Sequence, residues 1–222
     1  SSAQIEDGSW ILDPQNTPCV LSPDTTHHGL LFLDGHVEHI DVIFPVLHGE
    51  KCEDGAMQGL LTLSGVPFVG CGVAASANTM DKAITKVFAE RAGVSQAKSI
   101  VCFAADFLSD IQTQTAQAVD ALSLPIFVKP ARTGSSVGVS KVKRREDLAE
   151  AVAAARKYDE KIVLEACITG QEIECAVFGD AHGEVLTSIV GEICPAQEFY
   201  TYSAKYDDAG SLLYIPARIP PE

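Results

Sequence analysis

A short run of small residues between two apolar segments constrains the fold of this chain more than any other feature. Residues 126–129 (Ile-Phe-Val-Lys) and 138–142 (Gly-Val-Ser-Lys-Val) have the composition of strands, and Thr133-Gly-Ser-Ser-Val-Gly138 separates them. Such a turn exposes successive backbone N–H groups that can hold phosphate oxygens, and Lys129 can neutralise the same anion. An ordinary β-hairpin explains the same pattern, so the turn alone leaves both interpretations open.

The bulk properties exclude several classes of protein. The chain has 222 residues, 46% of them hydrophobic, which is enough for one large domain or two small ones with a sizeable core. Its apolar runs are far shorter than the ~20 residues that span a bilayer, and its first residues resemble no secretory signal. We therefore expect no membrane segment. The net charge of −14 repels a phosphate backbone, so we also expect no nucleic acid partner.

The cysteines indicate a reducing compartment. They are odd in number, widely spread and free of any C-x-x-C pair: Cys19, Cys52, Cys71, Cys102, Cys167, Cys175 and Cys194. This pattern fits reduced thiols better than a disulfide framework or a zinc site. We therefore predict a cytoplasmic location.

The first half of the chain mixes short strands with helices. We expect a strand over residues 29–33, a buried strand over 42–47, and another over 67–70. Apolar residues at helical spacing predict a helix over 54–64 and a second over 79–92, the latter with Thr79 as its N-cap. A domain boundary is expected near residues 76–79.

The second half follows the same mixed pattern. A helix is expected over residues 145–158, opened by acidic residues that suit a helix N-terminus, and strands over 161–165, 172–178 and 184–192. The polar, tyrosine-rich stretch 194–212 is predicted to be a long loop.

Several single residues have two interpretations when they are taken alone. Lys82 begins a predicted helix, where a lysine is usually only solvated. Glu165 and Glu172 flank a glycine turn, so they either accept hydrogen bonds from an adenine amino group and ribose hydroxyls or are solvated strand ends. His48 at a strand end is usually structural. The tyrosine-rich loop is equally a surface patch or a partner-binding patch.

Five short motifs in a fixed order favour the functional interpretations. They are residues 41–59 (Asp-Val-Ile-Phe-Pro-Val-Leu-His-Gly-Glu-Lys-Cys-Glu-Asp-Gly-Ala-Met-Gln-Gly), Met80-Asp-Lys82, Val128-Lys-Pro130 with Gly134-Ser-Ser-Val-Gly138, Glu165 with Gly170-Gln-Glu172, and Glu198-Phe-Tyr-Thr-Tyr-Ser-Ala-Lys-Tyr206. Together they resemble the D-alanine:D-alanine ligases of the ATP-grasp superfamily. The resemblance extends over about residues 41–222.

The resemblance implies a mixed α/β ATP-grasp fold with incomplete N- and C-terminal domains. Residues 1–79 would be the remainder of an N-terminal α/β substrate domain, and 80–166 the central ATP-grasp domain. Residues 167–222 would begin the C-terminal ATP-grasp domain and include an omega loop. ATP would lie between the last two domains. The family also implies a homodimer.

The resemblance further implies a set of site residues. The nucleotide would be bound by Lys82, Lys129, the Ser135-Ser136 loop, Glu165, Ala166, Ile168, Glu172 and Lys205. D-Alanine would be bound by His48, Glu53, Ser135 and Tyr206, of which His48, Ser135 and Tyr206 are the catalytic set. In this family ATP phosphorylates the carboxylate of the first D-alanine, and the amine of the second attacks the acyl phosphate, which supplies dipeptide for peptidoglycan precursors.

The loop also bears on the second substrate. Ligases that make the ester-linked product, as in vancomycin resistance, tend to differ from the Lys205-Tyr206 pattern found here. The pair therefore favours a dipeptide product over D-alanine:D-lactate. It leaves D-alanine and D-serine equally open as the second amino acid.

The sequence departs from the family pattern in three places. The glycine-rich opening segment is expected upstream of Ser1. Mg²⁺ is an expected cofactor, but its ligands are expected downstream of Glu222. The isolated chain is therefore expected to be inactive. A nucleotide-binding fragment that performs no chemistry is the alternative from another class. Cys52 stands where the family usually has glycine, which would strain a turn of positive φ.

Overall fold

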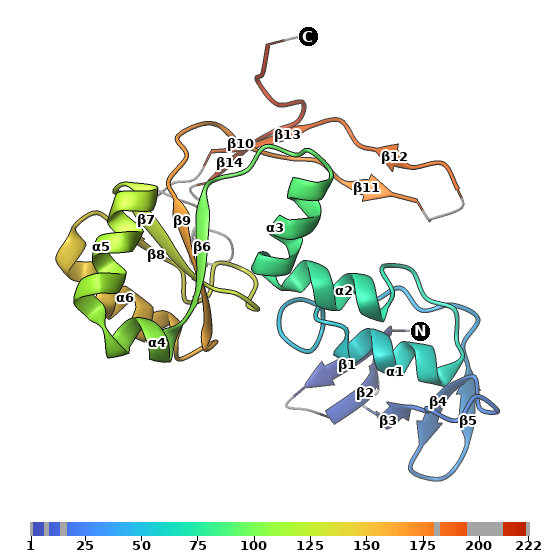
Figure 1. Cartoon of the computed structure of the whole chain (residues 1–222). Coiled ribbons are helices and arrows are strands. Elements are labelled where there is room, and N and C mark those ends of the chain that lie inside the picture. The colour runs from blue at the N-terminus through green and yellow to red at the C-terminus, as the bar shows by residue number, and fades with distance from the viewer. Residues whose placement is uncertain (1, 7–8, 14–16, 180–182, 195–210, 221–222) are drawn as a thin grey trace. The chain divides into compact units, whose positions relative to one another are not determined.

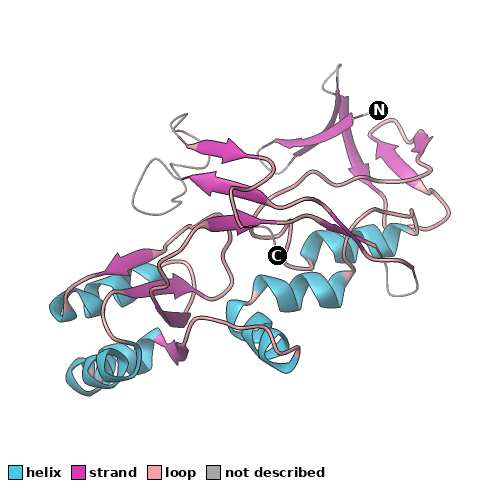
Figure 2. Ribbon diagram, turned by 90° about the horizontal axis from the view of Figure 1, so that it is seen from above, coloured by secondary structure: helices cyan, strands magenta, loops and turns pink. Residues whose placement is uncertain are grey.

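The computed structural model describes residues 2–6, 9–13, 17–179, 183–194 and 211–220. The chain forms two compact units, Ser1–Val94 and Ser95–Glu222 (Figure 1). Both units combine helices and strands, which confirms the predicted mixed α/β class (Figure 2). No helix in the described part of the chain is long and apolar enough to cross a membrane.

The N-terminal unit contains an antiparallel meander in which neighbours in sequence are neighbours in the sheet. Its strands are β1 (Ser2–Glu6), β2 (Ser9–Asp13), β3 (Thr17–Leu21), β4 (Gly29–Phe32) and β5 (Val37–His39). Strand β4 confirms the strand expected at 29–33, and the sequence did not predict the other four. The core forms where Leu21, Leu30 and Phe32 of β3 and β4 pack with Leu61.

Leu61 belongs to the first of the three helices formed by the described residues of this unit. Helix α1 (Ala56–Ser64) confirms the predicted helix and ends at Gly65, whose φ of 71° suits glycine. The helix predicted over 79–92 is wrong at its start, because α2 (Val73–Met80) contains Thr79 and α3 (Lys82–Arg91) begins later. The Thr79 hydroxyl donates to the Ala75 carbonyl within α2. The N-cap of α3 is Asp81, which accepts hydrogen bonds from the Ala83 and Ile84 amides at 3.0 and 3.3 Å.

The buried strand predicted over residues 42–47 is wrong. In the described structure this segment makes a single parallel bridge, from Ile43 to Phe68, and the strand expected at 67–70 is reduced to the same bridge. Val42, Phe44 and Val46 are 56%, 71% and 71% exposed. The apolar composition favours strand, but a regular strand needs a hydrogen-bonded neighbour along its length, and this segment has that neighbour at one residue only.

The C-terminal unit is built on a four-stranded antiparallel sheet with the order β6-β9-β7-β8. The strands are β6 (Ser99–Phe103), β7 (Ile126–Pro130), β8 (Ser140–Val142) and β9 (Lys161–Ala166). The strands predicted at 126–129 and 161–165 are confirmed, and that predicted at 138–142 is shorter. The helices are α4 (Ala104–Ser109), α5 (Ile111–Leu122), the 3-10 turn η1 (Arg145–Asp147) and α6 (Leu148–Ala155).

One face of this sheet forms the core of the unit. Phe107, Leu122 and Leu148 from the helices pack with Ile126 and Leu164 from the strands. Helix α6 confirms the centre of the helix predicted at 145–158, whereas β6, α4 and α5 were not predicted. The opposite face of the sheet carries the polar residues discussed below.

The remainder of the C-terminal unit consists of short antiparallel strands. A three-stranded sheet has the order β10 (Glu172–Glu174), β13 (Gly191–Cys194) and β14 (Leu212–Tyr214), and β11 (Val177–Phe178) pairs with β12 (Leu186–Thr187). The single strands expected at 172–178 and 184–192 are therefore each split in two. At the split, the Ser188 hydroxyl accepts the Ala176 amide hydrogen at 3.0 Å in place of a backbone carbonyl. Of the loop predicted at 194–212, residues 195–210 lie outside the described residues.

Candidate functional site

A group of charged side chains lies on the open face of the C-terminal sheet. Side chains alternate along β7, so Ile126 and Val128 enter the core while Phe127 and Lys129 face the other way. The strand register places Phe127 opposite Glu165 on β9 and opposite Lys141 on β8. Phe127 is thus at the centre of a small polar group.

Two ammonium groups lie over the Phe127 ring. The Nζ atoms of Lys129 and Lys141 are 5.3 and 5.7 Å from the ring centroid, within the range of cation–π attraction. The Lys129 ammonium also forms an ion pair with the Glu165 carboxylate. The structure therefore brings Lys129 and Glu165, two residues predicted for the nucleotide site, into contact beside the Phe127 ring.

The arrangement has the chemical groups that a nucleotide requires. An aromatic face can hold a flat base, a carboxylate can accept hydrogen bonds from an amino group, and an ammonium can neutralise phosphate. The side chains of Lys129 and Glu165 are 25% and 12% exposed. Partial burial strengthens interactions between charges, because less water screens them.

The glycine- and serine-rich turn connects β7 to β8 as an extended loop rather than a two-residue hairpin. Ser135 and Ser136 have φ values of 50° and 59°, in the left-handed region that residues other than glycine rarely adopt. The Val137 amide donates to the Gly134 carbonyl at 3.0 Å, and the Thr133 hydroxyl donates to the Val137 carbonyl at 3.1 Å. Strained residues of this kind often occur at functional sites.

The segment predicted to hold adenine follows directly from β9. Glu165 and Ala166 end the strand, and the Ala166 and Cys167 amides donate to the carbonyls of Lys98 and Pro125 at 2.9 and 3.2 Å. The Ala166 side chain packs against the core, so any contact with a base would come from its backbone. Ile168 and Glu172 are exposed.

Three of the predicted site residues belong to the N-terminal unit. His48 and Glu53 are exposed, and the Glu53 carboxylate accepts a hydrogen bond from the Gly49 amide. Lys82 is the first residue of α3, directly after the Asp81 cap. Lys205 and Tyr206 lie outside the described residues.

Cys52 does not carry the backbone strain that was expected because it stands where the family usually has glycine. The positive φ values here belong to Gly49 at 82°, Lys51 at 66° and Gly55 at 100°, and Cys52 has no positive φ. The unusual conformation therefore falls on Lys51. Burial raises the pKa of the Cys52 thiol, and the charges of Asp54 and Glu53 act in the same direction.

Two buried carboxylates were not found from the sequence. Asp159 lies between α6 and β9 and forms a two-point ion pair with Arg132, and Glu192 on β13 forms one with Arg218. Burial raises the pKa of Asp159, but hydrogen bonds from Arg132 and the Lys161 amide outweigh it and hold the pKa below its usual value. No local pattern signals such pairs, because the partners are 27 and 26 residues apart.

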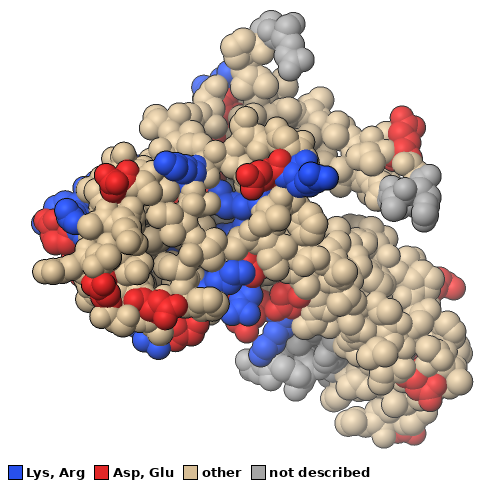
Figure 3. Space-filling model, viewed as in Figure 1, with Lys and Arg blue, Asp and Glu red and all other residues tan. Residues whose placement is uncertain are grey.

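The described residues contain no group of three or more His, Cys, Asp or Glu side chains that could hold a metal ion. All seven cysteines are free thiols. Figure 3 shows acidic and basic side chains interspersed on the C-terminal unit, so the net charge of −14 does not form one continuous field on that face.

Solved structures define the class of protein. D-alanyl-alanine synthetase A from Vibrio cholerae superposes with a TM-score of 0.81 at 26% identity, over 99% of this chain and 64% of that one. The VanG D-Ala:D-Ser ligase from Enterococcus faecalis gives 0.78 at 35% identity, over 94% and 59%. The fold is that of the ATP-grasp ligases, as the sequence predicted.

Family models identify the branch of this class. The model described as D-ala D-ala ligase N-terminus matches residues 21–71, and that described as D-ala D-ala ligase C-terminus matches residues 88–222. The chain belongs to the D-alanine–D-alanine ligase family.

Curated relatives carry the same family name. The D-alanine–D-alanine ligase of Caldicellulosiruptor bescii is 48% identical over 212 residues, which cover 92% of this chain and 56% of that protein. The ligase of Geobacillus kaustophilus is 48% identical over 188 residues, or 85% of this chain and 51% of that protein. The chain thus spans little more than half the length of these relatives.

Proposed function

We propose that this chain acts in the ATP-dependent ligation of two D-alanine molecules through an acyl phosphate, a step in peptidoglycan precursor synthesis. The observation that carries the proposal is the group of Phe127, Lys129 and Glu165 on the open face of the C-terminal sheet. The group lies in a chain of the D-alanine–D-alanine ligase family. Its aromatic ring and carboxylate suit the base of a nucleotide, and its ammonium group suits the phosphates.

In this proposal the nucleotide is bound mainly by electrostatic interactions. Lys82, Lys129 and Lys205 neutralise phosphate charge, and the Ser135-Ser136 loop supplies backbone N–H groups. Glu165, Ala166 and Ile168 hold the adenine, and Glu172 the ribose. Magnesium would shield the phosphate charge during transfer, and its ligands are not assigned to any described residue.

The proposed role of the remaining residues is to arrange D-alanine. The first amino acid would be oriented by His48, Glu53, Ser135 and Tyr206. Little translational and rotational freedom is then left to lose when the second amino acid attacks. The domains would be residues 1–79, 80–166 and 167–222, and the compact units divide inside the second of these, at Val94 and Ser95. The enzyme would act in the cytoplasm as a homodimer.

Calorimetric titration of the chain with ATP tests the nucleotide site. Lys129→Ala removes one ammonium from the Phe127 ring and should weaken ATP binding about tenfold or more, because a charge-assisted contact with phosphate is lost. Lys143→Ala is the matched control, since Lys143 is an exposed lysine just beyond β8. Equal affinity of the two variants for ATP would contradict the assignment of Lys129.

An assay of the full gene product tests the reaction. We expect phosphate release from Mg-ATP that depends on D-alanine, with the D-alanyl-D-alanine dipeptide identified by mass spectrometry. Phosphate release that is unchanged by D-alanine would show another acceptor, and ATP binding without turnover would favour a nucleotide-binding role alone.

A second candidate is the ligation of D-alanine to D-serine, which the likeness to the VanG D-Ala:D-Ser ligase favours, with 35% identity over 94% of the chain. Competition between D-alanine, D-serine and D-lactate in the same assay separates the alternatives. The Lys205-Tyr206 pattern predicts that D-lactate is the poorest acceptor.

A further inference from the structure

We propose that Asp159 is a positioning residue that fixes the loop 133–138 in the conformation that binds nucleotide phosphates, by holding Arg132 at the start of the loop. The proposal rests on the phosphate-binding role proposed for this loop. Asp159 itself would not touch the nucleotide.

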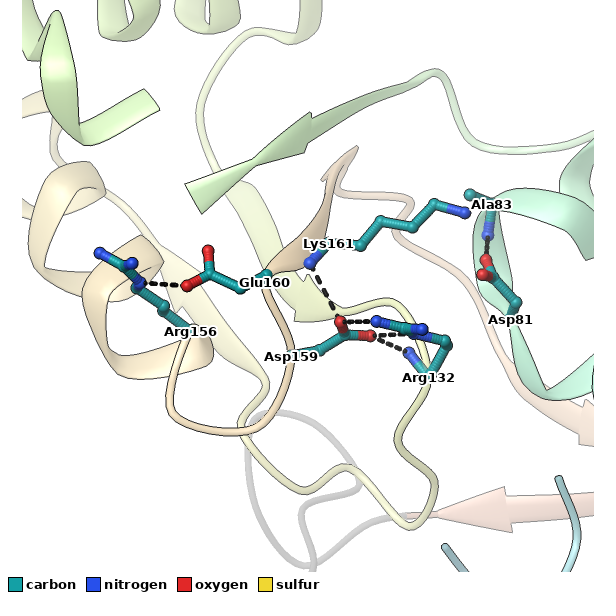
Figure 4. Close-up of polar contacts among 7 residues, drawn as sticks. All are labelled: Asp81, Ala83, Arg132, Arg156, Asp159, Glu160 and Lys161. Atoms are coloured by element: carbon teal, nitrogen blue, oxygen red, sulfur yellow. Dashed lines mark hydrogen bonds and ion pairs between the residues drawn. The ribbon is translucent and has the colours of Figure 1, made fainter. Parts of the chain in front are cut away.

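The contacts of Asp159 form a brace with four donors (Figure 4). One carboxylate oxygen accepts from the Arg132 amide and from Arg132 Nε, both at 2.9 Å. The other accepts from Arg132 Nη2 at 2.6 Å and from the Lys161 amide at 3.0 Å. Both the backbone and the side chain of Arg132 are therefore fixed where the chain leaves β7, and the same carboxylate is tied to the start of β9.

Burial makes this brace rigid. The Asp159 side chain is 2% exposed, whereas that of Arg132 is 60% exposed. A buried carboxylate tolerates little movement, because losing any of its donors would leave charge without compensation. The planar guanidinium meets the carboxylate at two points, which fixes direction as well as distance.

The residue before Asp159 contacts the other end of the loop. A Cβ atom on Gly138, the last residue of the loop, would lie 2.6 Å from Cδ2 of the Tyr158 ring. The ring therefore covers Gly138 closely. The Tyr158 and Asp159 amides both donate to the Ala155 carbonyl at the end of α6, at 3.0 and 3.2 Å, so this two-residue segment is itself anchored.

The conformation of the loop explains why such support is needed. Ser135 and Ser136 are consecutive L-residues at positive φ, and such residues persist where the surroundings over-determine the backbone. Tyr158 and Asp159 supply contacts at the two ends of this strained segment. A loop fixed before the nucleotide arrives loses less conformational freedom when phosphate binds.

The test is calorimetric titration of the whole chain with ATP and, separately, with adenosine, which lacks phosphates. We expect Arg132→Ala and Asp159→Asn to weaken ATP binding about tenfold and adenosine binding less than about twofold. Arg132→Lys should resemble Arg132→Ala, because an ammonium keeps the charge but cannot make the two-point contact. The double variant should be no weaker than the single variants, since both changes remove one interaction.

The control variant is Arg156→Ala. It removes an arginine–carboxylate pair to Glu160, 2.6 Å long and exposed on both sides, from the same region of Figure 4. ATP binding should not change. Hydrogen exchange followed by mass spectrometry gives a second readout without ligand, in which Asp159→Asn should speed exchange in residues 133–138 while β6 stays protected.

Each unfavourable outcome has its own signature. Wild-type ATP affinity in Arg132→Lys would show that Arg132 acts only as a cation near phosphate. Equal losses of affinity for ATP and for adenosine would show general damage to the structure. Either result overturns the positioning role of Asp159. Unchanged exchange in residues 133–138 overturns it as well. If the wild-type chain binds ATP no better than adenosine, the phosphate role of the loop fails first and the proposal with it.

Discussion

Thr115 is a polar residue inside the core of the C-terminal unit. It lies on α5, is 6% exposed, and its hydroxyl oxygen has no hydrogen-bond partner among the residues that the structure describes. A buried hydroxyl without a partner keeps its desolvation penalty, whereas valine has nearly the same shape. We expect Thr115→Val to raise the free energy of unfolding by about 1 kcal/mol, measured by urea denaturation.

The control is Thr113→Val on the same helix, where the side chain is exposed. The same chemical change should there alter stability by less than about 0.5 kcal/mol, because the hydroxyl is solvated. A loss of stability in Thr115→Val would show that the buried hydroxyl has a partner after all.

Glu192 should make stability depend on acid pH. Hydrogen bonds from the side chain and then the backbone amide of Arg218 lower its pKa from 4.5 to about 2. Because the folded-state pKa lies below the unfolded one, this stabilisation is fully present above about pH 4.5 and is lost as the pH falls toward 2. Glu192→Gln should therefore flatten the curve of unfolding free energy against pH in this range, measured by denaturation at a series of pH values.

The matched control is Glu174→Gln, an exposed glutamate on the neighbouring strand β10. This variant should keep the steep wild-type dependence between pH 4.5 and 2, since the Glu192–Arg218 contacts remain. If Glu192→Gln keeps the wild-type slope too, the ion pair does not contribute to acid stability.

At the scale of elements, the connection from β7 to β8 depends on Gly138. Its φ is 71°, and a Cβ atom would lie 2.6 Å from the Tyr158 ring and 2.8 Å from Pro130 Cγ. We expect Gly138→Ala to destabilise the C-terminal unit by roughly 1–3 kcal/mol, because both the backbone conformation and the space disfavour a side chain. Thermal unfolding followed by circular dichroism measures the change.

Gly170→Ala provides the comparison. A Cβ atom there meets no atom of the described residues within 4 Å, and Gly170 is not at positive φ, so the change should be nearly neutral. Comparable losses in the two variants would mean that Gly138 is not specially constrained.

Elements with strong local patterns could be predicted from the sequence, and the others could not. Helix α1 has apolar residues at helical spacing, and strand β9 contains a short continuous apolar run, which is typical of a buried strand. Helix α5 was missed because its buried face is made of Thr115, Ala118 and Leu122, which give little hydrophobic contrast. The segment 42–47 was wrongly predicted for the opposite reason, since its composition favours strand but its pairing does not.

The site divides in the same way. Family motifs indicated Lys129 and Glu165, which the structure places in contact. Asp159 and Glu192 have no local sequence pattern, because what distinguishes each is an ion pair with an arginine distant in sequence. The roles of the site residues remain predictions.

For the whole molecule, the two units have separate cores. Leu61 of α1 is 2% exposed and packs with β3 and β4, whereas Leu164 of β9 is 1% exposed and packs with the helices of the C-terminal unit. As far as the described residues go, each core is made of residues of its own unit. Because hydrophobic stabilisation is local to the residues that lose contact with water, damage to one core should act mainly within its own unit.

Two core substitutions test this independence against each other. Leu61→Ala and Leu164→Ala should each cost about 2–5 kcal/mol in the unit concerned, because each leaves a cavity. In hydrogen exchange, Leu61→Ala should speed exchange in β3, β4 and α1 and leave β7 and β9 protected, while Leu164→Ala should produce the reverse. If either substitution speeds exchange in both units equally, the chain unfolds as one cooperative body, and the affinity of Leu61→Ala for ATP would then also fall.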